Sequence, residues 1–347
     1  MGFNIFESHF FLFPLLENNS LYSGKFYCMN KQAVLIVVLV FFVITLTGQE
    51  RYLASVADEI IIETHTYISK DGQNLDLDVY YPAGDVENER PVLLFVHGGG
   101  FQGGVRNSEG NVEFCTRFAT LGYVAVSISY RLTRKGKEGG FGCQCPANEK
   151  LNTFFAAVED LQDATFYLIE NRAELGIDPQ KIILVGSSAG AETVLNAAYE
   201  PPYCYGLDSG PVDYAGVISM AGAIPDTSKI YKESAIPSLL FHGTDDNLVP
   251  YATAPHHYCE KEDPGYLVLH GSYTIAQKLE QLEIPYWLHT SCGSAHEIAN
   301  TPKTEYFDVM VDFCYNYIIK GEAESRQTII KEKKQNQEYE SFNFCEE

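Results

Sequence analysis

The stretch KIILVGSSAG at residues 181–190 decides the fold, because it joins an apolar run to a serine flanked by glycines. The run Ile182–Val185 is typical of a buried strand, and a helical pattern begins at Ala189. Between them, the motif Gly-x-Ser-x-Gly places Ser188 on a sharp turn from strand to helix. A nucleophilic serine needs such a turn, since its hydroxyl must project above the carboxyl edge of the sheet. The sequence therefore predicts Ser188 as a nucleophile.

A second glycine-rich turn, His97-Gly98-Gly99-Gly100-Phe101, directly follows the apolar run Val92–Val96. Consecutive glycines cost chain entropy, and an oxyanion hole is one purpose that explains them, because backbone N–H groups can then approach a substrate oxygen without an intervening Cβ. The alternative is a flexible turn, but it does not explain the position at a strand end, where ligands bind in open α/β sheets. We expect Gly99, Gly100 and Ala189 to supply the oxyanion N–H donors.

Working outward from these motifs, apolar runs alternate with helical patterns along the chain. Six runs are continuous, as in buried parallel strands: Val92–Val96, Tyr123–Ile128, Ile182–Val185, Val217–Met220, Ser238–Phe241 and Pro285–His289. The helical patterns are Asn111–Thr120, Asn152–Arg172, Ala189–Ala198, Ser272–Leu282 and Thr304–Ile319. Two earlier strands, Ile60–Ile68 and Leu75–Tyr81, are separated by a turn. This order predicts an α/β fold, with a mainly parallel sheet, an antiparallel N-terminal edge and helices on both faces.

Together these motifs resemble the α/β-hydrolase superfamily, and within it the hormone-sensitive-lipase-like carboxylesterases and the related bacterial acetyl-xylan and feruloyl esterases. The resemblance covers roughly residues 55–320 and rests on five segments: His97–Phe101, Ser127–Leu132, Gly186–Gly190, His242–Pro250 and Gly293–Glu297. It implies a serine esterase of the α/β-hydrolase fold, which forms an acyl-enzyme and requires neither a metal nor an organic cofactor.

The resemblance also implies a catalytic triad in the order serine, acid, histidine. The family pattern D-x-x-V-P matches Asp246 and leaves Asp245 as a turn residue. His296 is the only histidine after the last predicted strand, so it is the expected base. In this reading His296 takes the Ser188 proton, and Asp246 fixes the imidazole tautomer. We expect His97 and His242 to brace loops near the site.

Three insertions depart from the family pattern: Thr133–Leu151, Pro201–Pro211 and His256–Leu269. Only about a dozen residues separate Gly48 from the first strand, so a large N-terminal cap is not expected. An open site with small loop lids suits esters of short acyl chains or acylated carbohydrate. Two other functions stay open. One is a serine peptidase of the prolyl-oligopeptidase type, and the other is a catalytically inactive binding module on a hydrolase scaffold.

The N-terminal region contains a fourteen-residue apolar run, Ala33–Leu46, preceded by Lys31 and followed by small residues. This pattern is typical of a secretory signal peptide, which we place at residues 29–48, with 1–28 as a non-native upstream extension. The run is short for a transmembrane helix. We therefore expect a secreted or periplasmic enzyme without stable membrane insertion after cleavage; an uncleaved membrane anchor is the alternative.

Charge and cysteine content limit the partners. The formal net charge of −22 opposes binding to nucleic acid and to anionic lipid. Eight cysteines follow the signal segment, which permits disulfides in an exported chain, although their pairing stays open. Cys143-x-Cys145 lacks the second pair of a zinc site, so a disulfide or a free thiol is the better reading. The hydrolase domain is expected at 49–320, and the polar tail, 321–347, is expected to be loosely ordered.

Overall fold

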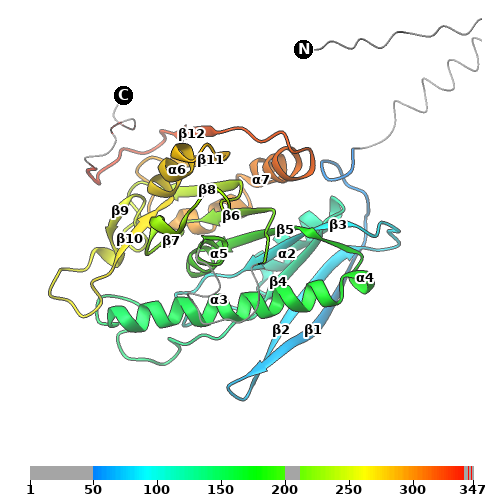
Figure 1. Ribbon diagram of the computed structural model, residues 1–347, viewed down its shortest axis with the longest axis horizontal. Coiled ribbons are helices and arrows are strands. Elements are labelled where there is room, and N and C mark those ends of the chain that lie inside the picture. The colour runs from blue at the N-terminus through cyan, green and yellow to red at the C-terminus, as the bar shows by residue number, and fades with distance from the viewer. Residues whose placement is uncertain (1–49, 200–211, 340–342, 344, 346–347) are drawn as a thin grey trace, which may run out of the picture. The chain divides into compact units, whose positions relative to one another are not determined.

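The computed structural model describes residues 50–199, 212–339, 343 and 345. The predicted signal segment and the insertion 201–211 lie outside these residues. Within them, a nine-stranded sheet runs in the order β1-β2-β4-β3-β5-β6-β8-β11-β12 (Figure 1). Its strands are β1 Ile60–Lys70, β2 Gln73–Pro82, β3 Arg90–Val96, β4 Val124–Ile128, β5 Ile177–Ser187, β6 Gly216–Met220, β8 Ser238–Gly243, β11 Tyr286–Ser291 and β12 Arg326–Ile330.

Strand pairing is parallel from β4 to β12, whereas β2 pairs antiparallel with both β1 and β4. The predicted sheet, with its antiparallel N-terminal edge, is therefore confirmed. Every residue of β3, β4, β6, β8 and β11 is buried, because helices cover both faces of the sheet. That burial explains why these strands have continuous apolar sequences rather than an alternating pattern.

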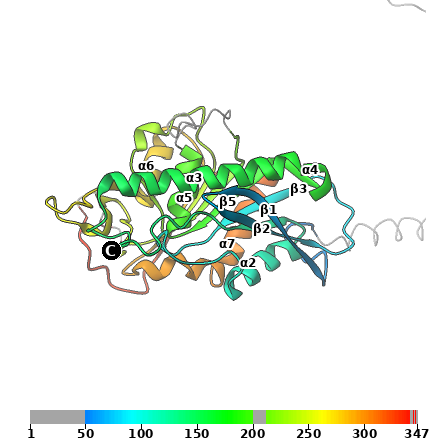
Figure 2. The same cartoon turned by 90° about the horizontal axis from the view of Figure 1, so that it is seen from below.

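Helices pack on both faces of the sheet and divide the core into two layers (Figure 2). Helix α3 (Ala147–Glu170), α5 (Ala189–Tyr199) and α6 (Ser272–Gln281) pack on one face, with the short α4 (Arg172–Leu175) following α3. Helix α2 (Glu109–Thr120) and α7 (Phe307–Phe313) pack on the other face, and the π-helical segment η6 (Cys314–Ile319) continues α7. Among the described residues, no helix is both long and apolar enough to span a membrane.

The sequence patterns did not predict a small second sheet, which has one strand before β8 and two strands after it. It joins β7 (Ala223–Ile224), β10 (Val268–Gly271) and β9 (Thr253–Pro255), all antiparallel. Short 3-10 turns connect the remaining segments: η2 Thr227–Lys229, η3 His256–Tyr258, η4 His296–Ala299 and η5 Thr301–Lys303. The strands of this sheet have only two to four residues, too few for a sequence period to identify.

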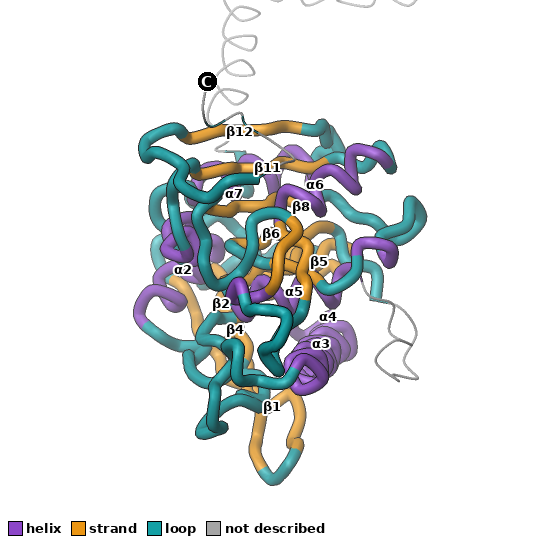
Figure 3. The backbone as a smooth tube through the Cα atoms, turned by 90° about the vertical axis from the view of Figure 1, so that its left-hand side faces the viewer, coloured by secondary structure: helices purple, strands orange, loops and turns teal. Residues whose placement is uncertain are grey.

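The expectation of a loosely ordered tail is wrong for its described part. Strand β12 pairs parallel with β11 and forms the edge of the sheet opposite β1 (Figure 3). Trp287 Nε1 donates to Thr328 Oγ1 at 2.9 Å, and a disulfide joins Cys345 to Cys292. Backbone pairing with β11 holds residues 326–330 in the sheet, although the tail around them has a polar sequence.

Candidate active site

Ser188 occupies the turn between β5 and α5, as the glycine–serine motif predicted. Its φ is +53°, a left-handed conformation that is uncommon for a residue with a Cβ. The Ser188 N–H donates to the Met220 carbonyl oxygen at 2.9 Å, and the Ser188 carbonyl oxygen accepts from the Glu192 N–H at 2.9 Å. These two bonds hold the strained turn against the end of β6 and against the first turn of α5.

The glycines on either side of Ser188 are required by close backbone approaches. A Cβ on Gly186 would lie 2.2 Å from the Gly190 carbonyl oxygen, and a Cβ on Gly190 would lie 2.0 Å from the Val96 carbonyl oxygen. Both distances are far below van der Waals contact. The motif therefore lets α5 pack directly against the ends of β5 and β3, which is how Ser188 reaches the carboxyl edge of the sheet.

A chain of two hydrogen bonds connects Ser188, His296 and Asp246. The Ser188 hydroxyl donates to His296 Nε2 at 2.7 Å, and His296 Nδ1–H donates to Asp246 Oδ2 at 2.7 Å. His296 is partly exposed, whereas the Asp246 side chain is fully buried. The three residues predicted from distant parts of the sequence thus lie together, in the geometry that proton transfer from the serine requires.

Besides His296, the Asp246 carboxylate has three polar neighbours. Its Oδ1 accepts the N–H groups of Leu248 and Val249 at 2.9 and 3.0 Å, while His242 Nε2 lies 3.4 Å from Oδ2. Burial alone would raise the pKa of Asp246, but its interactions with His242 and His296 outweigh burial and hold the pKa well below its usual range. Asp246 is therefore ionised beside His296.

Asp245 has a different role. Its Oδ2 accepts the backbone N–H of Asn336 at 2.8 Å and the Asn336 side-chain amide at 3.0 Å. Of the two adjacent carboxylates, the structure joins only Asp246 to His296, and Asp245 instead attaches the C-terminal tail to this loop.

The segment that carries His296 is attached to the neighbouring strand ends. Ser187 Oγ donates to the Ala299 carbonyl oxygen at 2.6 Å, which connects η4 to the end of β5. The Gly293 N–H donates to Thr244 Oγ1 at 2.8 Å, which connects the preceding turn to the end of β8. These bonds bring the base and the acid to adjacent strand ends.

The three predicted oxyanion donors lie beside Ser188. Gly99 and Gly100 have φ values of +124° and +59°, and both line the same cavity as Ala189 and Ser188. None of the hydrogen bonds between described residues has the Gly99 or Gly100 N–H as its donor. Ala189 is the first residue of α5, where the N–H has no partner within the helix. These N–H groups are thus available to a bound oxygen.

His97 and His242 both bind loop backbone, as expected. His97 Nδ1–H donates to the Gly98 carbonyl oxygen at 2.7 Å, and the Tyr130 hydroxyl donates to the His97 carbonyl oxygen at 2.8 Å. Burial lowers the pKa of His97. His242 lies within hydrogen-bond distance of Ser272 Oγ at 2.9 Å and of the Val249 carbonyl oxygen at 3.1 Å.

The site opens into a cavity of about 850 Å³. Sequence reasoning missed several polar residues of its wall: Ser108, Asn111, Glu192, His256, His257 and Lys303. Glu192 could have been found, because it lies four residues after Ser188 and therefore on the same face of α5. The others lie on α2, on the residue before it and on short 3-10 turns, and no local pattern identifies them. Lys303 Nζ donates to Asn111 Oδ1 at 3.0 Å, and burial lowers its pKa.

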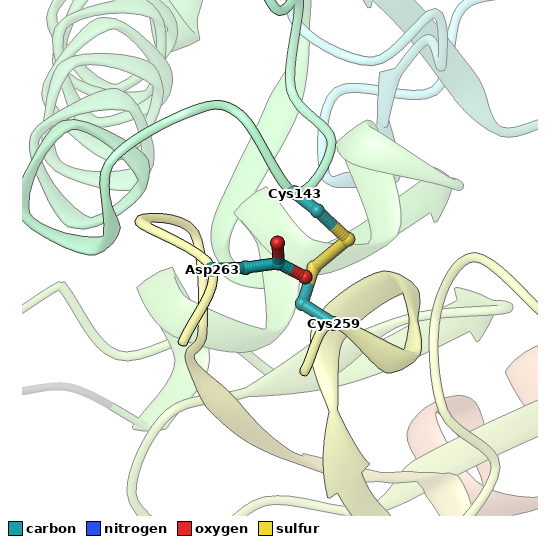
Figure 4. A group of neighbouring side chains, drawn as sticks. All are labelled: Cys143, Cys259 and Asp263. Carbon is teal, nitrogen blue, oxygen red and sulfur yellow. A yellow bond between two sulfur atoms is a disulfide. The ribbon is translucent and has the colours of Figure 1, made fainter. Parts of the chain in front are cut away.

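Cys143 and Cys259 form a disulfide beside the cavity, with the carboxylate of Asp263 nearby (Figure 4). Three such side chains in one place would suit a metal ion, but both sulfur atoms are used in the S–S bond and neither is a thiolate. The group therefore does not fit a metal while the disulfide is intact. Cys145 is a buried free thiol. The reading of Cys143-x-Cys145 as disulfide or free thiol is confirmed.

Parts of the chain are similar in sequence to known proteins. A family model described as BD-FAE matches residues 77–202, about a third of the chain, which include the glycine loop and the serine turn. Gut esterase 1 of Caenorhabditis briggsae is 33% identical over 127 residues, and phenmedipham hydrolase of Pseudarthrobacter oxydans is 34% identical over 143 residues. These alignments cover 37% and 41% of this chain, but only 21% and 26% of the relatives.

Solved structures extend the likeness over most of the chain. The apo form of esterase 2 from Thermogutta terrifontis aligns with a TM-score of 0.54 at 20% sequence identity. The alignment covers 76% of this chain and 96% of that one. The chain thus has the fold of this esterase, and the predicted fold class is confirmed. It thus has the α/β-hydrolase fold, and its residues 77–202 are similar to the BD-FAE family.

Proposed function

We propose that this protein is a serine esterase, which hydrolyses carboxylic esters through an acyl-enzyme. One observation carries the proposal: Ser188, His296 and Asp246 form a continuous hydrogen-bonded chain at the wall of a cavity, next to unused backbone N–H groups. The esterases and hydrolases among the similar proteins support the same activity.

The geometry supports the following steps. As the Ser188 oxygen attacks the ester carbonyl, His296 Nε2 takes its proton, and the ionised Asp246 stabilises the resulting imidazolium. The N–H groups of Gly99, Gly100 and Ala189 stabilise the negative oxygen of the tetrahedral intermediate, each by about 3 kcal/mol. His296 then protonates the leaving alcohol. Water activated by the same imidazole attacks the acyl-enzyme, which releases the acid and restores Ser188.

The substrate belongs, in this proposal, to esters of short acyl chains or of acylated carbohydrate. The polar groups on the cavity wall favour a substrate with hydrogen-bonding substituents over a long alkyl chain. The esterase from Thermogutta terrifontis was solved with propionate and with butyrate bound, and both are short carboxylates.

We further propose that the enzyme is exported and acts outside the cytoplasm. The apolar run Ala33–Leu46 motivates this, and two disulfides, Cys143–Cys259 and Cys292–Cys345, support an oxidising compartment. Sequencing of the N-terminus of the protein recovered from the exporting cell gives a first residue near Gln49 if the signal peptide is cleaved. A protein that keeps Ala33–Leu46 supports the anchored alternative.

The esterase proposal is tested on wild type and Ser188→Ala. Wild type hydrolyses p-nitrophenyl acetate and butyrate faster than palmitate and is labelled by a fluorophosphonate probe. Ser188→Ala loses at least about 10³-fold in kcat and all labelling. Faster cleavage of a peptide p-nitroanilide than of every ester indicates a peptidase. Wild type that neither hydrolyses esters nor reacts with the probe supports the inactive binding module.

A further inference from the structure

Two buried side chains on the cavity wall have polar atoms without a hydrogen-bond partner among the described residues. Glu192 and His256 are 2% and 1% exposed, and both line the cavity that contains Ser188 and His296. Within the described chain, Glu192 Oε1 and His256 Nδ1 have no hydrogen-bond partner. Buried polar atoms without a partner are costly, so this pair requires an explanation.

The two side chains come from different elements and are held in place. Glu192 is on α5, one turn after Ser188, and His256 begins η3, directly after β9. Glu192 Oε1 lies 3.5 Å from His256 Nε2. The His256 N–H donates to the Leu267 carbonyl oxygen at 2.8 Å, and the His256 ring packs edge-on against Phe141, with 5.1 Å between the ring centres. The pair is therefore positioned before any substrate binds.

Burial disfavours the charged form of both groups. Burial raises the pKa of Glu192 well above its usual range, and Lys150 offsets this only in part. Burial likewise lowers the pKa of His256 well below its usual range. A neutral carboxyl and a neutral imidazole each offer one donor and at least one acceptor. Such a pair is unsuited to holding an ion, but it complements a group that both donates and accepts a hydrogen bond.

We propose that Glu192 and His256 form a subsite that recognises a hydroxyl group on the ester substrate. A hydroxyl donates and accepts at once, so it satisfies the orphan atoms of both side chains. An apolar substituent would leave them unpaired, and sites of this kind reject analogues that lack the hydrogen-bonding group. This inference rests on the proposed esterase activity and adds two specificity residues to it.

The test compares two pairs of esters that differ by hydroxyl groups. Glycerol monoacetate and propyl acetate test the alcohol side, while p-nitrophenyl glycolate and p-nitrophenyl acetate test the acyl side. The readout in each pair is the kcat/KM of the hydroxylated ester divided by the kcat/KM of the ester that lacks the hydroxyl groups. The variants are Glu192→Leu, which removes the polar group, and Glu192→Gln, which keeps a donor and an acceptor. Thr193→Val is the matched control, because its hydroxyl donates to the Ala189 carbonyl oxygen within α5, at 2.8 Å.

We expect wild type to favour the hydroxylated ester in at least one pair. Glu192→Leu lowers that ratio about tenfold, whereas Glu192→Gln and Thr193→Val keep it within about threefold of wild type. A folded Glu192→Leu enzyme with the wild-type ratios in both pairs overturns the inference, and the esterase proposal stands. Should Glu192→Leu not fold, the same ratios measured on His256→Leu decide in the same way. Wild type inactive on all four esters contradicts the esterase proposal itself, and the inference with it.

Discussion

The adjacent carboxylates Asp245 and Asp246 have separate partners, and exchanging each for an amide separates their roles. Asp246→Asn replaces the carboxylate that fixes the His296 tautomer by an uncharged amide, so kcat for p-nitrophenyl acetate falls about 10³- to 10⁴-fold. Asp245→Asn is the control and changes kcat less than about threefold, because Asp245 binds Asn336 and not the imidazole. Equal losses in the two variants would contradict the assignment of Asp246 as the acid.

A second residue, His289, makes stability depend on pH. His289 lies on β11, where it is buried between Phe241 and Tyr306. This burial lowers the pKa of His289 to about 4, against about 6.5 in the unfolded chain. Between these values the unfolded state binds more protons. The free energy of unfolding therefore falls by about 2–3 kcal/mol as the pH decreases from 6.5 to 4, and the contribution is fully present above 6.5.

His289→Phe tests this prediction, because a phenyl ring fills the same place without titrating. Urea unfolding of both proteins at pH 7, 5.5 and 4.5 gives the free energy of unfolding. We expect the difference between the variant and wild type to shift in favour of the variant as the pH decreases. A difference that stays constant over this range would show that His289 does not titrate as described.

Among the elements, the glycine loop between β3 and α2 leaves no room for a methyl group at Gly99. A Cβ on Gly99 would lie 2.3 Å from the Gly103 carbonyl oxygen, and the φ of +124° disfavours any side chain. Gly99→Ala therefore displaces the oxyanion donors, and kcat falls about 10²- to 10³-fold. In Gly103→Ala the nearest atom is 3.9 Å away, so activity stays within a few fold. Similar kcat values in both variants would argue against an oxyanion role for this loop.

What the sequence could predict at this scale was local. Strand β5, the turn at Ser188 and helix α5 are adjacent in the chain, so their apolar period and glycine spacing identify them together. His296 and Asp246 were found only because the family resemblance gives an order of residues. Strand β12 and the β9–β10 pair depend on backbone pairing with distant segments, which leaves no period in their own sequence. His256 directly follows β9, so its own sequence surroundings do not indicate where it lies. Only the structure shows that it lies beside Glu192.

For the whole molecule, disulfides join distant segments to the site. Cys143–Cys259 connects the loop before α3 to the segment after η3, and Cys292–Cys345 connects the tail to the end of β11. The tail also contacts the acid loop, since the Tyr339 hydroxyl donates to the Thr244 carbonyl oxygen at 2.8 Å. Oxidative folding is thus linked to the arrangement of the catalytic loops.

Replacing both Cys292 and Cys345 by serine tests how much of the stability depends on this link. The two cysteines are 53 residues apart in sequence, and the entropy of closing such a loop predicts a loss of about 2–4 kcal/mol in the free energy of unfolding. Urea unfolding without reductant measures the loss in the double variant. Wild type treated with dithiothreitol must lose at least as much, because reduction also opens Cys143–Cys259. A double variant as stable as oxidised wild type would mean that β12 and the tail stay in place without the cross-link, through backbone pairing with β11 and the contacts of Asn336 and Tyr339.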